Sequence, residues 1–211
     1  NMLVKNNLDI KTLSKVYVDE KVLSGNQVSV DGSSQLNSIS TCSANMCQAE
    51  CDPTTECPPQ DVEMPPIDFD SDGPDSFLSK ANISNCSSLR NDGKINCVFT
   101  VNEFENVLWD NYPSITFPTG VVVYVQGDVN IRAGQKLTIA GTLLSDRDIN
   151  LGQDNCWLKY QPPYFRCGAS TVTVLRPSDS LPSGLLAKRK FGIGGSFGIG
   201  THSLLVNGLV Y

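Results

Sequence analysis

The chain has 211 residues, a formal net charge of −6 at pH 7 and a sequence pI near 4.7. This acidic balance disfavours nonspecific binding to nucleic acid and to anionic membranes, so we expect neither as a partner. The eight cysteines, an even number, indicate disulfide bonds and hence an extracellular or cell-surface protein. No run of residues approaches the roughly 18–20 apolar residues that cross a membrane, so no membrane contact is expected of the chain as given.

Residues 1–34 alternate apolar and polar positions. The apolar positions share one phase, as in a strand with one buried face: Val16, Val18, Val22, Val28 and Val30. Asp31-Gly32 is a turn signal that closes the pattern. We therefore predict two short strands in residues 1–34, forming the first coil of a larger sheet.

Residues 35–66 lose this periodicity and are rich in Ser, Cys, Pro and Asn. Four cysteines follow the spacing C-x4-C-x3-C-x5-C: Cys42, Cys47, Cys51 and Cys57. A zinc site is one interpretation, because thiolates from one loop can complete a tetrahedron. Two local disulfides are preferred, since the spacing lacks a C-x2-C knuckle and no histidine is nearby. The pairing among the four cysteines stays open.

An acidic segment follows, in which four carboxylates match the pattern D-x-D-x-D-G-x-D: Asp68, Asp70, Asp72 and Asp75. Calcium takes six to eight oxygen ligands, and carboxylates at alternate positions before a tight Gly turn can wrap around one ion. The twelfth position, where a bidentate Glu is usual, is Ser79. Calcium is the one cofactor that the sequence suggests, and an acidic solvated turn is the alternative.

Residues 82–97 contain two glycosylation triplets and two cysteines. The triplets NIS and NCS make Asn82 and Asn85 candidate glycosylation sites in a host that glycosylates. The residues Asn91-Asp92-Gly93, between the cysteines, are a hairpin turn signal. We therefore predict that a disulfide joins Cys86 to Cys97 across a hairpin.

Residues 100–110 carry the clearest helix signal. Thr100-Val101-Asn102-Glu103 is a capping box, in which the Thr hydroxyl and the Glu carboxylate bond the free amides of a helix start. Apolar residues then recur at helical spacing until Tyr112-Pro113. We predict one short helix whose aromatic face, around Phe104 and Trp109, packs against the sheet. Ligand stacking on that face is the alternative.

The central stretch, residues 119–152, has the strongest strand signal. Its apolar residues keep odd numbers throughout: Val121, Val123, Val125, Val129, Ile131, Leu137, Ile139, Leu143, Ile149 and Leu151. Fully extended, the stretch would measure about 110 Å, whereas a compact domain of this size has a radius of gyration of about 17 Å, so it must turn back. Corners are expected at Gly127-Asp128, Ala133-Gly134, Gly141 and Ser145-Asp146. A meander of hairpins and a coiled β-solenoid both keep one buried phase through such short corners.

Cys156 and Cys167 enclose the loop WLKYQPPYFR. A disulfide between them would hold four aromatic residues on a rigid excursion: Trp157, Tyr160, Tyr164 and Phe165. Rigid exposed aromatics grip sugars or protein partners, so these residues are candidates for ligand contact. The alternative is that they cap the end of the hydrophobic core.

The rest of the chain returns to strand. Thr171 to Leu175 is a predicted strand, and the repeat FGIG in residues 183–211 indicates two more short strands. The trio Lys188-Arg189-Lys190 is interpreted as a solvated corner, too small for a nucleic-acid site. We therefore expect an all-β fold: N-terminal strands in residues 1–34, a cysteine-rich insertion with one short helix in residues 35–118, and a β-solenoid, or parallel β-helix, core in residues 119–211.

The runs GVVVYVQGDVNI, LTIAGTLLSDRDINLG, PSGLLAKRKFGIG and VNGLVY carry a family resemblance. The chain resembles the C-terminal β-solenoid region of PilX-like, pilus-associated surface proteins of bacteria, and more faintly the polymer-forming bactofilins. The resemblance covers about a third of the chain and implies a cell-surface role. The hydrophobic N-terminal helix of the pilin pattern is missing. Because the chain begins at Asn1 and ends at Tyr211 inside an apolar run, we expect that both ends are cuts.

The sequence therefore predicts a structural or adhesive component of an extracellular appendage, a pilus or filament subunit or a tip protein, without catalysis. Self-association or contact with other appendage subunits is expected, with Leu205 and Leu209 as candidate contacts. A carbohydrate-binding module on the 156–167 loop is an alternative. A polysaccharide-active β-helix enzyme is another, with Asp128, Asp146, Arg147 and Asp148 as candidates, although Asp is favoured at corners for turn geometry alone. The lone histidine, His202, is interpreted as a surface or packing residue.

Overall fold

The computed structural model describes residues 2–4, 7–11, 14–48, 50–52, 57, 67–132, 134–152, 170–175, 184–193 and 202–210. These residues form a mostly β fold with two short helices, α1 (Phe77–Ile83) and α2 (Val101–Asp110). The strands are β1 (Met2–Val4), β2 (Leu8–Ile10), β3 (Lys15–Val18), β4 (Lys21–Ser24), β5 (Val28–Val30), β6 (Gln35–Asn37), β7 (Ser40–Cys42), β8 (Val98–Thr100), β9 (Ser114–Phe117), β10 (Val122–Gln126), β11 (Val129–Ile131), β12 (Lys136–Ile139), β13 (Thr142–Ser145), β14 (Asp148–Leu151), β15 (Thr171–Val174), β16 (Gly184–Ala187), β17 (Lys190–Ile193), β18 (Ser203–Val206) and β19 (Leu209–Val210).

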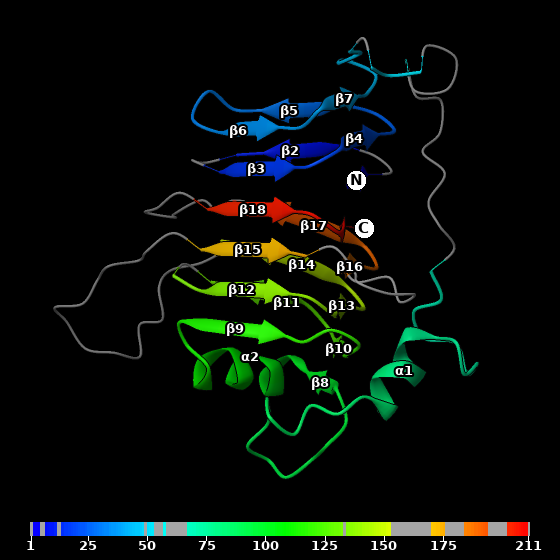
Figure 1. Ribbon diagram of the computed structural model, residues 1–211, viewed down its shortest axis with the longest axis vertical. Coiled ribbons are helices and arrows are strands. Elements are labelled where there is room, and N and C mark those ends of the chain that lie inside the picture. The colour runs from blue at the N-terminus through cyan, green and yellow to red at the C-terminus, as the bar shows by residue number, and fades with distance from the viewer. Residues whose placement is uncertain are drawn as a thin grey trace, which may run out of the picture.

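The strands form three sheets, which we call A, B and C. Sheet A has the order β7-β4-β1-β19-β16-β13-β10-β8, sheet B the order β11-β14-β17-β2-β5, and sheet C the order β6-β3-β18-β15-β12-β9. Consecutive strands from β1 to β7 and from β8 to β19 belong to different sheets, so that β10, β11 and β12 lie in A, B and C before β13 returns beside β10 (Figure 1). All neighbouring strands in these sheets are parallel, which excludes a meander of hairpins for them.

The register repeats every twenty residues at several places in the stack. Val123 pairs with Leu143 in sheet A, and Val129 pairs with Ile149 in sheet B. Because twenty is an even number, residues of the same parity stack on the same side of each sheet. Val123, Leu143 and Leu185 form one such row, and all three are fully buried.

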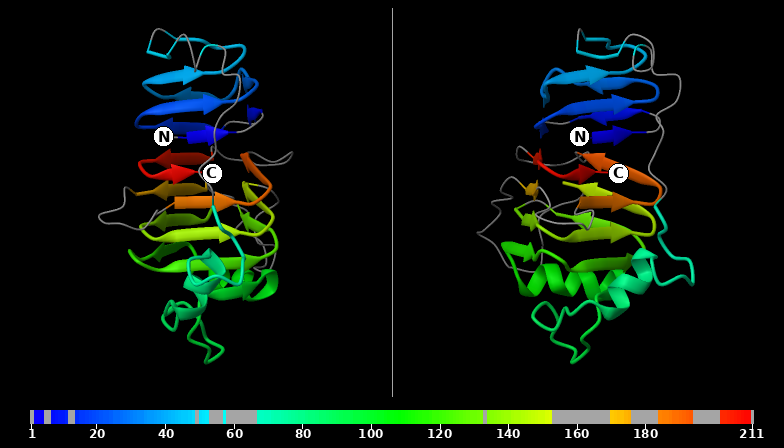
Figure 2. Two further views of the ribbon diagram at one scale, coloured as in Figure 1. Left: turned by 90° about the vertical axis from the view of Figure 1, so that its right-hand side faces the viewer. Right: turned by 45° about the vertical axis from the view of Figure 1, so that its right-hand side comes forward.

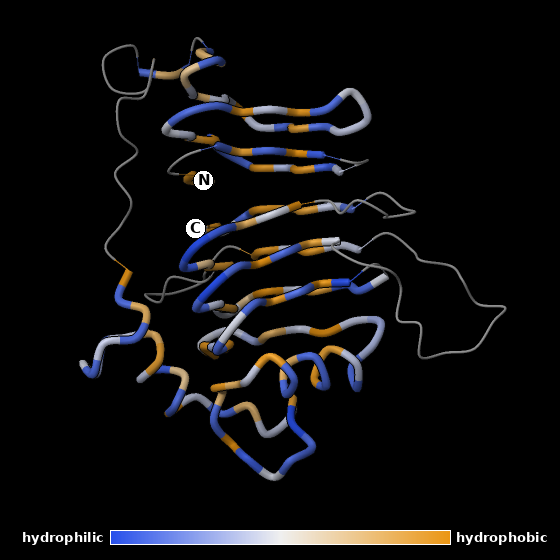
Figure 3. The backbone as a smooth tube through the Cα atoms, turned by 180° about the vertical axis from the view of Figure 1, so that it is seen from behind, coloured by the Kyte–Doolittle hydropathy of each residue, from blue (hydrophilic) through white to orange (hydrophobic). Residues whose placement is uncertain are grey.

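The interior is made of the odd-numbered apolar residues that the central stretch predicts. From Val123 to Leu151 these residues are at most 2% exposed, whereas Val121 is only partly buried. Figure 3 shows the alternation of hydrophobic and hydrophilic residues along the strands. The strands break at 127–128, 132–135, 140–141 and 146–147, where the corners are predicted. Each buried Val, Leu or Ile stabilises the fold by about 1.5–3 kcal/mol relative to exposure, an upper bound for a chain that is compact when unfolded.

The outward side of sheet A is also apolar, because a second layer covers it. Tyr124, Leu144 and Leu186 are at most 1% exposed although they point away from the interior row. Helix α1 packs on β10, with Phe77 and Ala81 buried. The sequence analysis missed α1, which has only seven residues and directly follows the acidic segment. Its start is capped by Ser76, whose hydroxyl accepts a hydrogen bond from the amide of Ser79.

The N-terminal strands lie beyond the C-terminal strands in the stack. Strands β1, β2 and β3 pair with β19, β17 and β18, while β8, β9 and α2 lie at the opposite end (Figures 1 and 2). Residues 1–34 contain five strands rather than the two predicted, and they do not begin the stack. The predicted insertion, residues 35–118, contributes β6, β7, β8 and β9 to the sheets, so all three predicted segments share one set of sheets.

Candidate functional site

The two ends of the stack are where an elongated parallel fold meets its surroundings, and we call them the lower end (β8, β9, β11 and α2) and the upper end (β5, β6 and β7). Helix α2 closes the lower end with the predicted capping box: Thr100 Oγ1 accepts from the Glu103 amide at 3.3 Å, and Glu103 Oε2 accepts from the Thr100 amide at 2.8 Å. Phe104 is buried and stacks on Phe117 at 6.1 Å between ring centroids. The predicted packing of this aromatic face against the sheet is therefore confirmed for Phe104.

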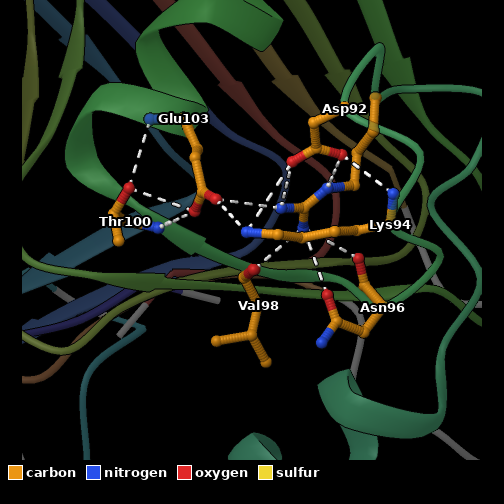
Figure 4. A network of polar contacts seen from close by, with 7 residues as sticks. Asp92, Lys94, Asn96, Val98, Thr100 and Glu103 are labelled. Atoms are coloured by element: carbon orange, nitrogen blue, oxygen red, sulfur yellow. Dashed lines mark hydrogen bonds and ion pairs between the residues drawn. The ribbon is translucent and has the colours of Figure 1, made fainter.

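A buried arginine organises the loop beneath β8 (Figure 4). The Arg90 side chain is 1% exposed, and its guanidinium lies 4.2 Å from the ring centroid of Phe99. Nε and Nη2 donate to the two carboxylate oxygens of Asp92 at 2.9 Å each, and Nη1 donates to the backbone oxygens of Asn96 and Val98 at 3.0 and 2.9 Å. Nη2 also lies 3.3 Å from Glu103. Four of the five N–H groups of the guanidinium therefore donate hydrogen bonds within the protein, and Nη2 also takes part in the ion pair with Glu103.

The acidic partners of this network stay ionised. Hydrogen bonds from the Arg90 side chain lower the pKa of Asp92 to about 2. A hydrogen bond from Lys94, with another from the Thr100 amide, lowers the pKa of Glu103 to about 2. Both side chains are partly exposed, so solvent screens part of the interaction energy. A cavity of about 260 Å³ adjoins the network, in which Arg90 is engaged by Asp92, Glu103 and two backbone oxygens.

The upper end is stapled by two disulfides. Cys42 pairs with Cys51 and Cys47 pairs with Cys57, with Cα–Cα distances of 5.8 and 5.5 Å. The two disulfide loops, whose pairing the sequence left open, thus interleave, and the zinc interpretation is wrong for these four cysteines. Cys86 and Cys97 also form the predicted disulfide. The predicted hairpin between them is wrong: residues 86–97 contain no strand, because the loop wraps around Arg90 instead.

A side-chain amide closes the edge of sheet B at the upper end. Asn45 accepts a hydrogen bond from the Val28 amide at 2.9 Å and donates one to the Val28 carbonyl at 2.7 Å, as a neighbouring strand would. The Thr41 amide of β7 donates to the side-chain oxygen of Gln48. Among the described residues no strand pairs with the outer edge of β6. The sequence analysis missed Asn45 and Arg90, because their roles depend on partners that only the fold brings near.

Two carboxylates of the acidic segment have partners: Asp68 bonds within the segment and Asp70 joins the segment to the β16 corner. Asp68 accepts hydrogen bonds from the amide and the hydroxyl of Ser71, and the hydrogen bond from the hydroxyl lowers its pKa. Asp70 forms an ion pair of 2.7 Å with Lys188, which follows β16. Within the described ranges no group of three or more His, Cys, Asp or Glu side chains is close enough to hold a metal. Calcium at Asp68, Asp70, Asp72 and Asp75 therefore stays a prediction.

The corner between sheets A and B contains Asp128, Asp146 and Asp148, the carboxylates that the sequence suggests for a polysaccharide-active enzyme. Asp148 forms a two-pronged ion pair with Arg189, at 3.1 and 3.0 Å, and its amide donates to Asp128 at 3.2 Å. Asp146 lies near Tyr124, and burial together with Asp146 and Asp70 raises the pKa of Tyr124 to about 12. Arg189, from the predicted basic corner, thus neutralises Asp148, which lies one strand above Asp128. The ion pair joins two neighbouring strands at this corner.

His202 is fully buried at a corner before sheet C. Its Nδ1 lies 2.6 Å from Ser170 Oγ, and its Nε2 has no hydrogen-bond partner among the described residues. Burial lowers the pKa of the imidazole, so the ring is neutral near pH 7. Gly152 packs against the ring, where a Cβ atom would lie 2.6 Å from its carbons. His202 is a packing residue, as the sequence analysis allowed, and not a surface one.

The remaining predicted site residues divide between the described part of the chain and the rest. Asn82 and Asn85 are exposed near the end of α1, and Leu205 is 39% exposed on the outward side of sheet C. Leu209 lies in β19, which is flanked by β16 and β1 and is no edge of the described stack. The aromatic loop with Trp157, Tyr160, Tyr164 and Phe165, and the Cys156–Cys167 pair, lie outside the described residues.

Comparisons with protein-family models, with curated proteins and with solved structures found no match to this chain. Among the described residues, neither helix has the length and apolar character needed to cross a bilayer. The three disulfides fit an oxidising environment.

Proposed function

We propose that this chain is an extracellular β-solenoid that serves as a structural or adhesive component of a cell-surface appendage, without catalysis. One observation carries the solenoid: three parallel sheets share one interior, and the chain returns to sheet A in parallel after each circuit, twenty residues later at β10–β13 and at β1–β4. Parallel strands that return to the same sheet after each circuit wind a coil around a common core.

The way the ends are built supports a structural role. The lower end is closed by an amphipathic helix and an arginine network, and two of the three sheet edges at the upper end have side-chain or disulfide-stapled caps. Such caps protect the backbone groups of terminal strands from uncontrolled pairing. The disulfides of the upper cap lower the conformational entropy of the unfolded chain. For short loops this stabilises the folded state by about 2–3 kcal/mol. The capped ends and the disulfides favour a fold that stays stable in an extracellular environment.

The charged corner supports a role without catalysis. A polysaccharide-active site needs one carboxylic acid that holds its proton and one free carboxylate on the same face. Here Asp148 is engaged by Arg189 and Asp128 accepts from the backbone of Asp148. These partners favour a corner that joins neighbouring levels. The resemblance to PilX-like surface proteins points the same way, and glycan binding by the 156–167 loop is the alternative that we retain.

The test is electron microscopy with light scattering of the oxidised protein, with and without calcium. The proposal predicts ordered filaments or stacked oligomers that increase with protein concentration. A monomer at every concentration, together with new reducing ends or unsaturated products from polyuronates or neutral glycans, would contradict the proposal and support the enzyme. A monomer that is retained by immobilised glycans would replace the structural role with the binding module.

A further inference from the structure

The two ends of the described chain meet in the middle of the stack rather than at its ends. In sheet A, β1 pairs with β19 through Met2 and Val210, and β4 continues the sheet beyond β1. Figure 1 shows the N and C labels side by side between the blue and the red strands. We call residues 2–42 the N-terminal block, residues 67–210 the main block, and the boundary between them the seam. No strand runs across the seam within the described residues.

Among the described residues, the seam has fewer register pairs than the level directly below it. Below it, β13–β16, β14–β17 and β15–β18 each contribute four register pairs. Across the seam β18–β3 contributes four, whereas β19–β1 and β17–β2 contribute one each among the described residues. Fewer register pairs join the two blocks in sheets A and B of the described chain, so the seam is the level at which we expect the N-terminal block to separate.

Both sides of the seam are made for pairing with a strand. The main block offers the edge of β18, and the N-terminal block offers β3 in matching register from Lys15 to Val18. The interior rows also continue across it, since Leu204 and Val16 are register partners and both are fully buried. Because every copy of this chain carries the same two surfaces, the N-terminal block of one copy fits the main block of another.

The connection between the blocks is long enough for this exchange. The disulfides tie residues 42–57 to the upper end, which leaves ten steps of chain from Cys57 to Ile67. Ten steps reach about 33 Å when extended. In the closed chain the path runs from β7 to the level of β16, where Asp70 bonds Lys188, and four strand spacings amount to about 19 Å. The connection is therefore longer than the closed chain requires. The extra length lets it reach a neighbouring copy that lies next to sheet A.

We propose that copies of this chain associate by exchanging their N-terminal blocks at the seam. The partner is a second copy, and the contact is the strand pairing of β1, β2 and β3 on β19, β17 and β18. This inference rests on the proposed function only in that self-association is what an appendage subunit needs. Opening the seam exposes strand edges in all three sheets, whereas the lower end and the upper edges of sheets A and B are capped.

The register supplies a matched test with the full chain. Leu205 has two partners on the outward side of sheet C: Tyr17 across the seam and Thr173 within the main block. Single variants Tyr17→Cys, Thr173→Cys and Leu205→Cys are folded together in pairs, treated with a short bismaleimide, and separated on reducing gels. The double variant Y17C/L205C in one chain reports whether the two sites lie within reach of the reagent.

Exchange predicts cross-linked dimers from Tyr17→Cys mixed with Leu205→Cys, in about tenfold or greater excess over Thr173→Cys mixed with Leu205→Cys, because pairing holds the two thiols at high effective concentration. Equal yields from the two mixtures, or no dimers from either while the double variant cross-links internally, would overturn the exchange. If light scattering then still shows oligomers, the appendage role stands and another surface carries the association. If the protein is monomeric as well, both proposals fail.

Discussion

Replacing Arg90 with Met is expected to lower the free energy of unfolding by about 1–3 kcal/mol for each buried backbone carbonyl that loses its donor. The Arg90 side chain is 1% exposed and supplies donors to Asp92, to Glu103 and to two backbone carbonyls. Met fills part of the volume but leaves those carbonyls without a partner, and an unpaired buried acceptor is costly. Equilibrium unfolding in urea, under oxidising conditions, measures the change.

Lys94→Met is the matched control for Arg90. Lys94 contacts the same two carboxylates, Asp92 and Glu103, but its side chain is 56% exposed. Ion pairs at such exposed positions contribute about 1 kcal/mol or less. If Arg90→Met costs no more than Lys94→Met, the arginine does not hold the lower end together, and the network of Figure 4 is a surface feature.

Gly152→Ala is expected to destabilise the fold by about 2–5 kcal/mol, from two separate causes. Gly152 has φ +78°, a left-handed conformation that costs a residue with a Cβ about 1–2 kcal/mol. The new Cβ would also lie 2.6 Å from the buried ring of His202, and forcing atoms into a packed interior costs about 1–3 kcal/mol. Thermal and urea unfolding both report the loss.

Gly120→Ala separates these two causes. Gly120 has φ +77°, and a Cβ there would meet no atom within 4 Å, so this variant carries the backbone cost alone. A double-mutant cycle of Gly152→Ala with His202→Ala isolates the contact with the ring. Equal losses for Gly152→Ala and Gly120→Ala would contradict the packing of His202 against Gly152.

The sequence predicts the strands of residues 119–152 well because their signal is local. Alternation of apolar residues predicts that Val129 and Ile131 face the interior, whichever strands lie beside them. The corner residues at 127–128 clearly interrupt the pattern. The capping box at Thr100 is local too, and α2 begins there. Alternation does not identify the partner of each strand, so a meander of hairpins and a coil predict the same pattern. The parallel pairing of β10 with β13 distinguishes them.

The place of the N-terminal strands could not be read from alternation. Val16 and Val18 carry the same pattern as the central stretch, but their partners Leu204 and Val206 are almost the whole chain away. Pairing at that distance depends on the complete stack and on nothing within residues 1–34. The N-terminal strands therefore seemed to begin the sheet, although they continue it above its last C-terminal strands.

The candidate sites also divide into those with a local sequence signal and those that depend on the complete fold. The sequence predicts the pair Cys86–Cys97 correctly although the hairpin from which it is inferred is absent, whereas four cysteines in one loop permit several pairings that only the structure distinguishes. Arg90 directly precedes the Asn91-Asp92-Gly93 turn signal, but no motif marks the arginine itself, and its importance comes from acceptors in the following loop, in β8 and in α2. Residues whose role depends on partners that folding brings together have no signature in a single sequence.

A circular permutant tests the order of the stack most directly. In it, a short Gly-rich linker joins residue 211 to residue 1, and new ends are opened between residues 58 and 66, so that all three described disulfides are kept. Because Met2 and Val210 are register partners, this joining is expected to preserve the fold. The account predicts the same far-UV circular dichroism, the same disulfide pairs by mass spectrometry and a thermal midpoint at or above that of the parent chain. An unfolded permutant, or one with different disulfides, would contradict the placement of the N-terminal strands above β18 and β19.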